Sequence, residues 1–402
     1  MPIMAATRPG PALAALAIGT FALGMTEFVI TGLLPEIAAD LRVSIPRAGL
    51  LISAYALSVV IGGPIVTGLV ARRSRKLVLV ALLAFFVIGN AVSALAPGYP
   101  AMLTGRIVAA LCHGAFIGFA TIVAGDLVAP ERRSSAIAAM LSGLTLANVA
   151  GVPLGTLLGQ HLGWRATFWT MALIGLLAAV ATAAFVPSST TTATGPPVRD
   201  QLRAFATPGV WLALAMTALA FGAVYAPFTY IAPLMTEVAG FSPAALPWLL
   251  ALFGLGLVLG NVIGARAADR SLMPTLITAS TAMLIVLITF AWTADFRRPA
   301  AITLFVLGVV AYATVPGLTT RVVTSADGNA QNLLASSAAV SAFNLGNAAG
   351  AYLGGRAIEA GWGYASTPLV GAAMEAAALV VAAVSIVVAR RTAVHRLGSF
   401  DE

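Results

Sequence analysis

Long apolar runs alternate along the chain with short segments rich in Pro, Gly and Arg. A helix that crosses the hydrocarbon core of a bilayer needs about 20 mainly apolar residues. The pattern therefore predicts an all-α integral membrane protein with twelve spanning helices. Their approximate limits are 12–34, 47–71, 77–96, 101–127, 136–159 and 166–186, followed by 209–232, 244–265, 275–293, 299–320, 332–354 and 366–389.

The composition excludes a water-soluble fold of this length. Of the 402 residues, 60% are hydrophobic and 9% are charged, whereas soluble domains carry about 25% charged and about 45–50% apolar residues. The single cysteine, Cys112, can form no intramolecular disulfide. The first apolar run is longer than the core of a signal peptide and contains Glu27, so we expect it to be retained as a span.

The charge pattern predicts the topology. The chain has 22 Lys and Arg against 14 Asp and Glu, a net charge of +8. The basic residues lie in short clusters between apolar runs, and because they form no continuous basic face we expect no nucleic-acid partner. With the N-terminus inside, fifteen of them fall on inner segments and six on outer ones. Cytoplasmic loops are enriched in positive residues, so both termini are predicted to be cytoplasmic.

The two halves of the chain share a spaced pattern of residues. At an offset of 197 residues Pro46 falls on Pro243, and at 199 Asn148 falls on Asn347. Such a repeat predicts two pseudo-symmetric six-helix halves, an architecture typical of secondary transporters with a central site.

The longest polar stretch separates these halves. It predicts an N-terminal half over 1–186, a cytoplasmic linker over 187–208, and a C-terminal half with a short cytoplasmic tail over 209–402.

Glycines repeat every four residues in three of the predicted spans. This spacing places small residues on one helix face, where backbones approach closely. Static packing and a sliding seam between the halves are both consistent with it. The stripes are Gly151, Gly155 and Gly159; Gly256, Gly260 and Gly264; and Gly346, Gly350 and Gly354.

Motifs for ordinary enzyme chemistry are missing from the sequence. The only lysine, Lys76, follows no phosphate-binding loop, and no Gly-x-Ser-x-Gly elbow occurs. Three histidines and one cysteine are too few and too dispersed for a zinc site. We therefore expect no enzymatic activity, no cofactor and no metal.

Four ionisable residues stand out inside predicted spans, where charge is costly and marks functional candidates; a further acid, Asp126, lies closer to the inner boundary of its span. Glu27 can be a satisfied structural acid or a proton carrier, since a carboxyl whose surroundings alternate can load and release a proton. Arg106 and His113, seven residues apart on one helix face, can likewise pack statically or take part in proton coupling. For Glu375, in the last span, a packing partner or snorkelling is favoured over a transport role.

Several short motifs are spread over nearly the whole chain. They are Thr26-Glu27-Phe28, Leu34-Pro35-Glu36-Ile37-Ala38, Gly105-Arg106, His113-Gly114-Ala115-Phe116, the run from Gly143 through Asn148, Gly151 and Pro153 to Gly155, and Ala342-Phe343-Asn344. Together they resemble the major facilitator superfamily, specifically its bacterial drug:proton antiporter group, and within that group the branch of arabinose-efflux permeases and chloramphenicol-efflux proteins.

The resemblance implies roles for several of these residues. Arg106 corresponds to a span-4 arginine associated in the family with proton coupling, and we expect Glu27 and His113 to act with it. Gly151 and Pro153 correspond to the span-5 antiporter motif, although the order Gly-Val-Pro-Leu-Gly departs from the commoner Gly-Pro.

The family's loop motif between spans 2 and 3 is only partly present. Gly68, Arg73 and Lys76 fit it, whereas Arg72 replaces an Asp that helps lock the inner gate in the family. The equivalent loop of the second half keeps Asp269-Arg270. The resemblance thus implies a gating role for these six residues, with the first half of the lock altered.

Together these features predict a monomeric transporter of the bacterial inner membrane that works by alternating access. A proton moving in would drive out a small organic solute, which is sugar-like, a nucleoside or an amphenicol-type antibiotic. A proton-coupled importer, a facilitative uniporter, and a membrane-embedded enzyme or receptor are the alternatives. The candidate substrate contacts near mid-membrane are Phe21, Asn148, Tyr225, Tyr230, Phe343 and Asn344.

Overall fold

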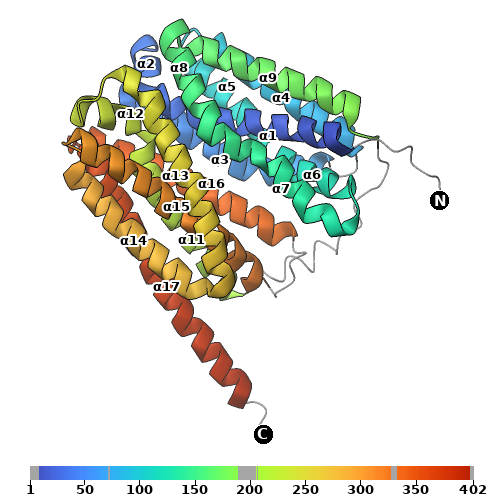
Figure 1. The fold of residues 1–402 in the computed structure, drawn as a ribbon, viewed down its shortest axis with the longest axis vertical. Helices are drawn as coiled ribbons and strands as arrows, with labels where there is room; N and C mark the ends of the chain where they lie inside the picture. Colours follow the sequence, from blue (N-terminus) through green and yellow to red (C-terminus); the bar gives the residue numbers. More distant parts are fainter. Residues whose placement is uncertain (1–8, 71–72, 189–204, 206, 327–332, 399–402) are drawn as a thin grey trace. The chain divides into compact units, whose positions relative to one another are not determined.

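The computed structural model describes residues 9–70, 73–188, 205, 207–326 and 333–398. Every regular element within these ranges is a helix (Figure 1). Eleven helical segments of the described chain are long and apolar enough to cross a membrane. The helical membrane fold predicted from the apolar runs is therefore confirmed, while the cytoplasmic placement of the termini stays a prediction.

The first six predicted spans all correspond to helices. A short helix, α2 (Leu34–Asp40), follows the first of them, and a 3-10 turn, η1 (Pro130–Arg132), precedes the fifth. The spans are α1 (Pro9–Gly32), α3 (Ile45–Val70), α4 (Arg75–Ala94), α5 (Tyr99–Leu111) with α6 (His113–Asp126), α7 (Arg133–Leu146) with α8 (Val152–Leu162), and α9 (Trp164–Phe185).

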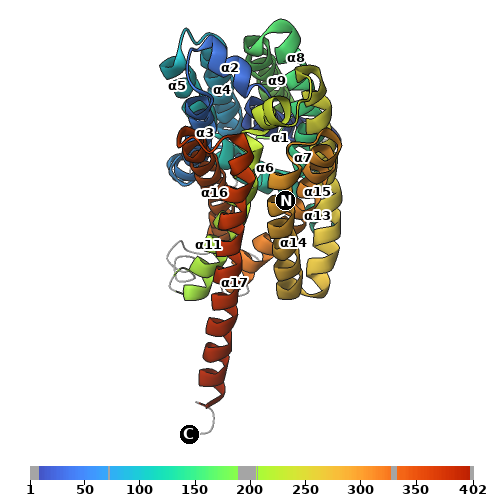
Figure 2. The ribbon, with the colours of Figure 1, turned by 90° about the vertical axis from the view of Figure 1, so that its left-hand side faces the viewer.

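The last six predicted spans also correspond to helices. They are α11 (Pro208–Thr229), α13 (Leu246–Arg270), α14 (Leu272–Thr293), α15 (Arg297–Ser325), α16 (Leu333–Glu359) and α17 (Thr367–Gly398). Short elements join them: α12 (Ile231–Pro233), η4 (Leu234–Val238), η5 (Pro243–Ala245) and η6 (Tyr364–Ser366). Helix α17 has 32 residues and continues well past the end of its neighbour α14 (Figure 2).

Helix α16 accounts for the difference between twelve predicted spans and the eleven observed. It is 27 residues long, but it is not among the eleven helices apolar enough to span a membrane. Asn344 and Asn347 in its middle lower its apolar content. The twelfth span therefore stays a prediction.

Internal contacts divide the chain into two units. The first unit is Met1–Thr194 with Phe241–Gly254, and the second is Gly195–Gly240 with Leu255–Glu402. In the first, α1 packs against α7 and α9, and α4 packs against α5 and α9. In the second, α11 packs against α16 and α17, and α14 packs against α15 and α17. Helices of the same rank thus pair in the same way in each unit, as expected of a duplicated chain.

The predicted boundaries 1–186, 187–208 and 209–402 stay predictions. Most of the predicted linker lies outside the described residues.

The glycine stripes pack helices of their own unit together. The stripe that begins at Gly151 lies against α1, the stripe of α13 lies against α15, and the stripe of α16 lies against α11. At Gly260 and Gly350 an added Cβ would meet a backbone carbonyl of the neighbouring helix. These contacts favour the packing interpretation of the stripes.

Many large apolar side chains point away from the helix contacts. Leu69, Trp248 and Trp292 are each more than 70% exposed. A water-soluble protein rarely exposes apolar surface on this scale, so these faces are suited to contact lipid.

Candidate transport site

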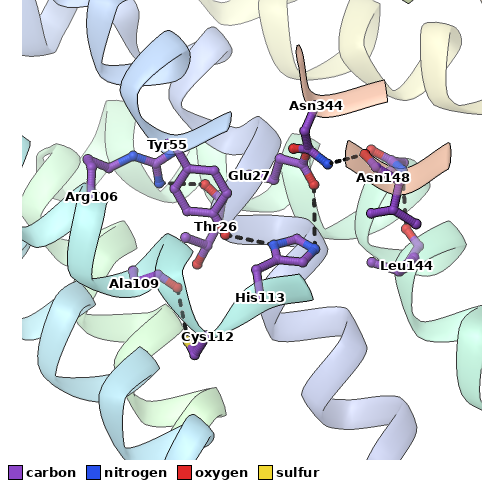
Figure 3. Close-up of polar contacts among 11 residues, drawn as sticks. Thr26, Glu27, Tyr55, Arg106, Ala109, Cys112, His113, Leu144, Asn148 and Asn344 are labelled. Atoms are coloured by element: carbon purple, nitrogen blue, oxygen red, sulfur yellow. Dashed lines mark hydrogen bonds and ion pairs between the residues drawn. The ribbon is translucent and has the colours of Figure 1, made fainter. Parts of the chain in front are cut away.

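A cluster of ionisable and hydrogen-bonding side chains lies inside the first unit (Figure 3). It consists of Glu27 on α1, Tyr55 on α3, Arg106 on α5 and His113 at the start of α6. We call these four residues the charged cluster. The structure thus brings together the three residues predicted to couple protons, whose role stays a prediction. Tyr55 was missed because nothing in its local sequence distinguishes it from other aromatic residues in apolar spans.

Arg106 is the fully buried cation of this cluster, with 0% of the residue exposed. Its Nη1 donates a hydrogen bond to the Thr26 carbonyl oxygen at 2.7 Å, and its Cζ lies 4.1 Å from the centroid of the Tyr55 ring. An aromatic face attracts a guanidinium, more strongly where water is excluded. The Glu27 carboxyl, when ionised, also attracts this cation. These contacts hold the cation inside the bundle.

His113 lies between Tyr55 and Glu27. Its Nδ1 is 2.9 Å from the Tyr55 hydroxyl oxygen, and its Nε2 is 3.8 Å from Glu27 Oε2. When Tyr55 donates its phenolic proton to Nδ1, the neutral imidazole carries its own proton on Nε2. The N–H group then faces the carboxyl. A hydrogen bond thus joins Tyr55 to His113, and Nε2 of His113 faces the carboxyl from beyond hydrogen-bond distance.

The helix of the predicted fourth span is locally distorted beside His113. Helix α5 ends at Leu111 and α6 begins at His113, with Cys112 between them. Cys112 keeps a right-handed helical conformation, and Tyr99–Asp126 forms one span of 28 residues. Gly62 of α3 lies directly against the Leu111 backbone, so α3 approaches the distortion closely.

The charged cluster has the parts of a proton-exchange site. A carboxyl group keeps its proton in apolar surroundings and gives it up beside a cation or a hydrogen-bond donor. Glu27 has 13% of its side chain exposed and has the His113 ring beside it. The carboxyl therefore lies at the border between apolar helix faces and a polar ring.

A π-helix occupies the predicted span-5 motif. It covers η2 (Ala147–Gly151), where the Val152 N–H donates to the Ala147 carbonyl. Pro153 has no N–H to continue the ordinary pattern, and such π-bulges are frequent at functional sites. Gly151 lies against the Phe21 ring, so the predicted gating and substrate-contact residues meet here.

Asn148 lies within the same π-helix and is half-buried. Its Nδ2 donates to the Leu144 carbonyl at 3.2 Å.

An aromatic cluster lies in the second unit. The Phe221 ring centroid is 4.7 Å from that of Phe343, 5.5 Å from that of Tyr225 and 6.2 Å from that of Tyr312. We call these four residues, from α11, α15 and α16, the aromatic cluster. Tyr225 and Phe343 were predicted as substrate contacts. Phe221 and Tyr312 were missed, because the long-range packing that joins them cannot be derived from spacing.

Tyr230 and Asn344, also predicted as substrate contacts, donate hydrogen bonds to backbone carbonyls of the second unit. The Tyr230 hydroxyl donates to the Ala351 carbonyl at 2.8 Å, and the residue is fully buried. Asn344 Nδ2 donates to the Val340 carbonyl one helical turn away, at 3.1 Å. Tyr230 therefore fastens α11 to α16, and a substrate role for either residue stays a prediction.

The predicted gating residues lie at helix ends. Gly68 and Arg73 are exposed, and Lys76 is half-buried in the first turn of α4. Asp269 and Arg270 are exposed at the end of α13, and Arg72 lies outside the described residues. Their gating role stays a prediction.

Asp126 supplies an acidic partner in this region that the loop motif did not reveal. Its carboxylate accepts hydrogen bonds from Arg75 at 2.5 Å and from Arg133 at 3.5 Å. The carboxylate at the end of α6 thus ties the start of α4 to the start of α7.

Comparison with known proteins identifies the family. The family model of the Major Facilitator Superfamily matches residues 16–340. The chain belongs to this superfamily. The inner membrane transport protein YdhP of Escherichia coli (strain K12) is 40% identical over 92% of this chain and 94% of its own. The chloramphenicol resistance protein of Streptomyces lividans is 39% identical over 83% and 86%.

Solved structures of the superfamily share the fold. A bacterial homolog of the human lysosomal transporter Spinster, in an inward-facing and unoccupied conformation, matches with a TM-score of 0.70 at 18% identity, over 95% of this chain and 96% of that one. This likeness shows the fold, whereas the family model and the relatives confirm the resemblance to the superfamily and are consistent with its drug:proton antiporter branch.

Membership of the superfamily has three consequences. The chain is a membrane transporter of a small molecule, embedded in a lipid bilayer. Its relatives and its multi-pass helices place it in a bacterial inner membrane. The transport fold of its relatives separates it from enzymes at the level of the family.

Proposed function

We propose that this transporter exports a small organic solute in exchange for protons by alternating access. The charged cluster carries the proposal. The Glu27 carboxyl lies 3.8 Å from the His113 imidazole. The carbonyl of the preceding residue, Thr26, accepts a hydrogen bond from the fully buried guanidinium of Arg106. Ionisable groups inside a membrane are functional candidates by default, with proton relays among their roles.

Proton exchange at Glu27 couples to conformation through Arg106. When Glu27 is ionised, its charge attracts the guanidinium and its oxygens can accept the His113 N–H. When a proton binds, the O–H bond forms, the negative charge disappears and this attraction is lost. Each charge state therefore favours a different arrangement of α1, α5 and α6, which is what coupling of a proton to alternating access requires.

The aromatic residues and the π-helix supply the solute contacts in this proposal. The ring faces of Phe21 and of the aromatic cluster favour flat or partly apolar solutes, and Asn148 adds an amide. The chloramphenicol resistance protein among the relatives supports an amphenicol-type antibiotic as the first solute to test. At the inner gate, Asp126 pairs with Arg75 and Arg133. In this way it takes over part of the role of the Asp that the family's loop motif has at the position of Arg72.

Transport by inside-out membrane vesicles tests the proposal. Vesicles that are acid inside should accumulate chloramphenicol when they contain the wild-type chain, and accumulation should collapse with the gradient. Glu27→Gln should abolish the gradient-dependent part while leaving exchange of labelled for unlabelled solute. Glu27→Asp should keep partial activity with a shifted pH optimum, because a titrating group remains.

The control is Glu131→Gln, the same chemical change at an exposed residue of η1, which should transport like the wild type. Gradient-driven accumulation by Glu27→Gln would contradict the role of Glu27. If no solute of a panel of amphenicols, sugars and nucleosides accumulated in wild-type vesicles, while solute entered those of the opposite orientation, the chain would be an importer.

A further inference from the structure

A second buried carboxyl lies in the second unit, outside the charged cluster. Glu375 on α17 is 0% exposed, and neither of its carboxyl oxygens has a hydrogen-bond partner among the described residues. It lies near the middle of the apolar segment Tyr364–Val388. A carboxyl at this depth without a bonded partner is unusual, because buried polar groups are normally satisfied.

The helices that pack on α17 offer Glu375 no neighbouring cation. Helices α11 and α14 contain no Asp, Glu, Lys, Arg or His, and Tyr225 is the titratable residue of α11. The charged residues of α16, Arg356 and Glu359, lie in its last turn and pair with each other at 2.7 Å. The short element η6, also against α17, adds Tyr364 at its start.

A described cation that does contact α17, Arg321, lies far along the helix from this carboxyl. Arg321 of α15 donates to the Ser385 hydroxyl at 2.8 Å. Ser385 follows Glu375 by ten residues, which corresponds to about 15 Å along a helix. Arg321 is thus held at a different level of α17.

These surroundings exclude a stable carboxylate. Moving an isolated carboxylate into an apolar medium costs far more than folding can supply, and such a group takes up a proton instead. We propose that Glu375 is a second proton-binding site of the transporter, occupied by a proton in this conformation. The binding itself is independent of the proposed function, whereas its use as a second coupled proton rests on that function.

Ser280 on α14 gives the site a means of releasing the proton. It is fully buried and close enough to influence the carboxyl, yet its hydroxyl makes no hydrogen bond in this conformation among the described residues. When water reaches the site in another conformation, the acid O–H bond can break and the proton pass to that water. The carboxylate left behind can then accept the Ser280 hydroxyl.

Infrared spectroscopy of the full chain in liposomes of bacterial polar lipids tests this proposal without a solute. The wild type minus Glu375→Gln difference at neutral pH should contain the C=O stretch of a protonated carboxyl. The band should shift in Glu375→Asp, which assigns it even if the Gln variant folds poorly. It should persist in Glu27→Gln, because Glu27 lies in the other unit.

Exchange into D2O separates a working site from a static one. If the conformation alternates, the band should move to its deuterated position within minutes, and Ser280→Ala should slow the exchange severalfold. An ionised carboxylate signal in place of the band would overturn the proposal, and so would a band that resists D2O for many hours. Failure of solute transport with a normal band would count against the proposed function and leave this site intact.

Discussion

Corresponding positions in the two units carry opposite chemistries. At an offset of 198 residues Glu27 falls on Tyr225, and at 199 His113 falls on Tyr312. Glu27 and His113 belong to the charged cluster, whereas Tyr225 and Tyr312 belong to the aromatic cluster. The helix pairings around them are the same in both units. Packing between helices therefore sets the shared fold, and side chains that do not carry this packing are free to differ.

The difference matches the two roles in the proposed function. The first unit holds a buried cation and the acid proposed to exchange a proton, and the second presents the ring faces and edges proposed to contact the solute. Each aromatic pair contributes about 0.5–1.5 kcal/mol beyond area burial, whereas a buried charge that loses its partner costs several kcal/mol. Substitutions in the two clusters should thus differ in size and in kind.

The largest effect is expected at Arg106. Arg106→Ala removes the bond to the Thr26 carbonyl and the contact with the Tyr55 ring, and leaves a large cavity. The free energy of unfolding should fall by about 3–5 kcal/mol. Thermal unfolding in detergent measures this, with Arg132→Ala as the exposed control. Arg106→Lys should fold better but lose gradient-driven transport, because an ammonium cannot reproduce the planar contacts. An Ala variant as stable as the wild type would contradict the account of this cation.

The glycine contacts should be equally intolerant in both units. A Cβ at Gly143 would collide with the Ala17 carbonyl and the Thr20 hydroxyl of α1, and one at Gly350 would collide with the Gly222 carbonyl of α11. Each Gly→Ala change should cost about 1–3 kcal/mol through overpacking. Gly118→Ala is the matched control, since an added Cβ there meets nothing within 4 Å and Ala is the better helix former. Unequal costs at the first two sites would break the parallel between the units.

A smaller effect is expected in the aromatic cluster. Phe221→Ala removes the ring that contacts Phe343, Tyr225 and Tyr312, so chloramphenicol should bind more weakly by about 1 kcal/mol, or roughly fivefold in concentration dependence. The pH profile of transport should stay the same. Trp292→Ala, at an exposed aromatic of the same unit, serves as control. A changed pH profile with unchanged concentration dependence would show that the two clusters do not divide the work.

The smallest effect concerns Glu36, an acid of the first unit outside the spanning helices. Burial raises the pKa of its carboxyl above the ordinary value of 4.5, and hydrogen bonding to its own backbone N–H, with a smaller effect of Gln160, only partly opposes this. The folded chain therefore holds this proton to higher pH than the unfolded chain. As the pH rises from the ordinary pKa of Glu36 through the raised one, this carboxyl should lower the free energy of unfolding.

Thermal unfolding across the mildly acidic range measures this effect. Glu36→Gln should unfold at the same temperature as the wild type at the acidic end and at a slightly higher one at neutral pH. Glu131→Gln should show no such trend. A benefit of Glu36→Gln confined to acidic pH would contradict the sign.

Several parts of the fold and site could be predicted from the sequence, and others could not. The apolar runs located each helix closely, because a run long enough to span a bilayer has few alternatives. The distortion at Cys112 was not predicted, because an apolar run has the same sequence pattern whether or not its helix is regular. Glu27, Arg106 and His113 were found because charge inside an apolar run is visible without a fold. Tyr55 and Phe221 could not be found in this way, since their roles come from contacts between distant segments.

Proton movement in proteoliposomes tests the central claim most directly. Purified wild-type chain is reconstituted with a pH-sensitive dye sealed inside, and a chloramphenicol gradient is imposed without any pH gradient. The account predicts that solute leaving the liposomes brings protons in, so that the lumen acidifies, and that Glu27→Gln passes solute without any change in the dye. Solute flux through the wild type that leaves the dye unchanged, or equal acidification by Glu27→Gln, would contradict the claim that Glu27 couples protons to export.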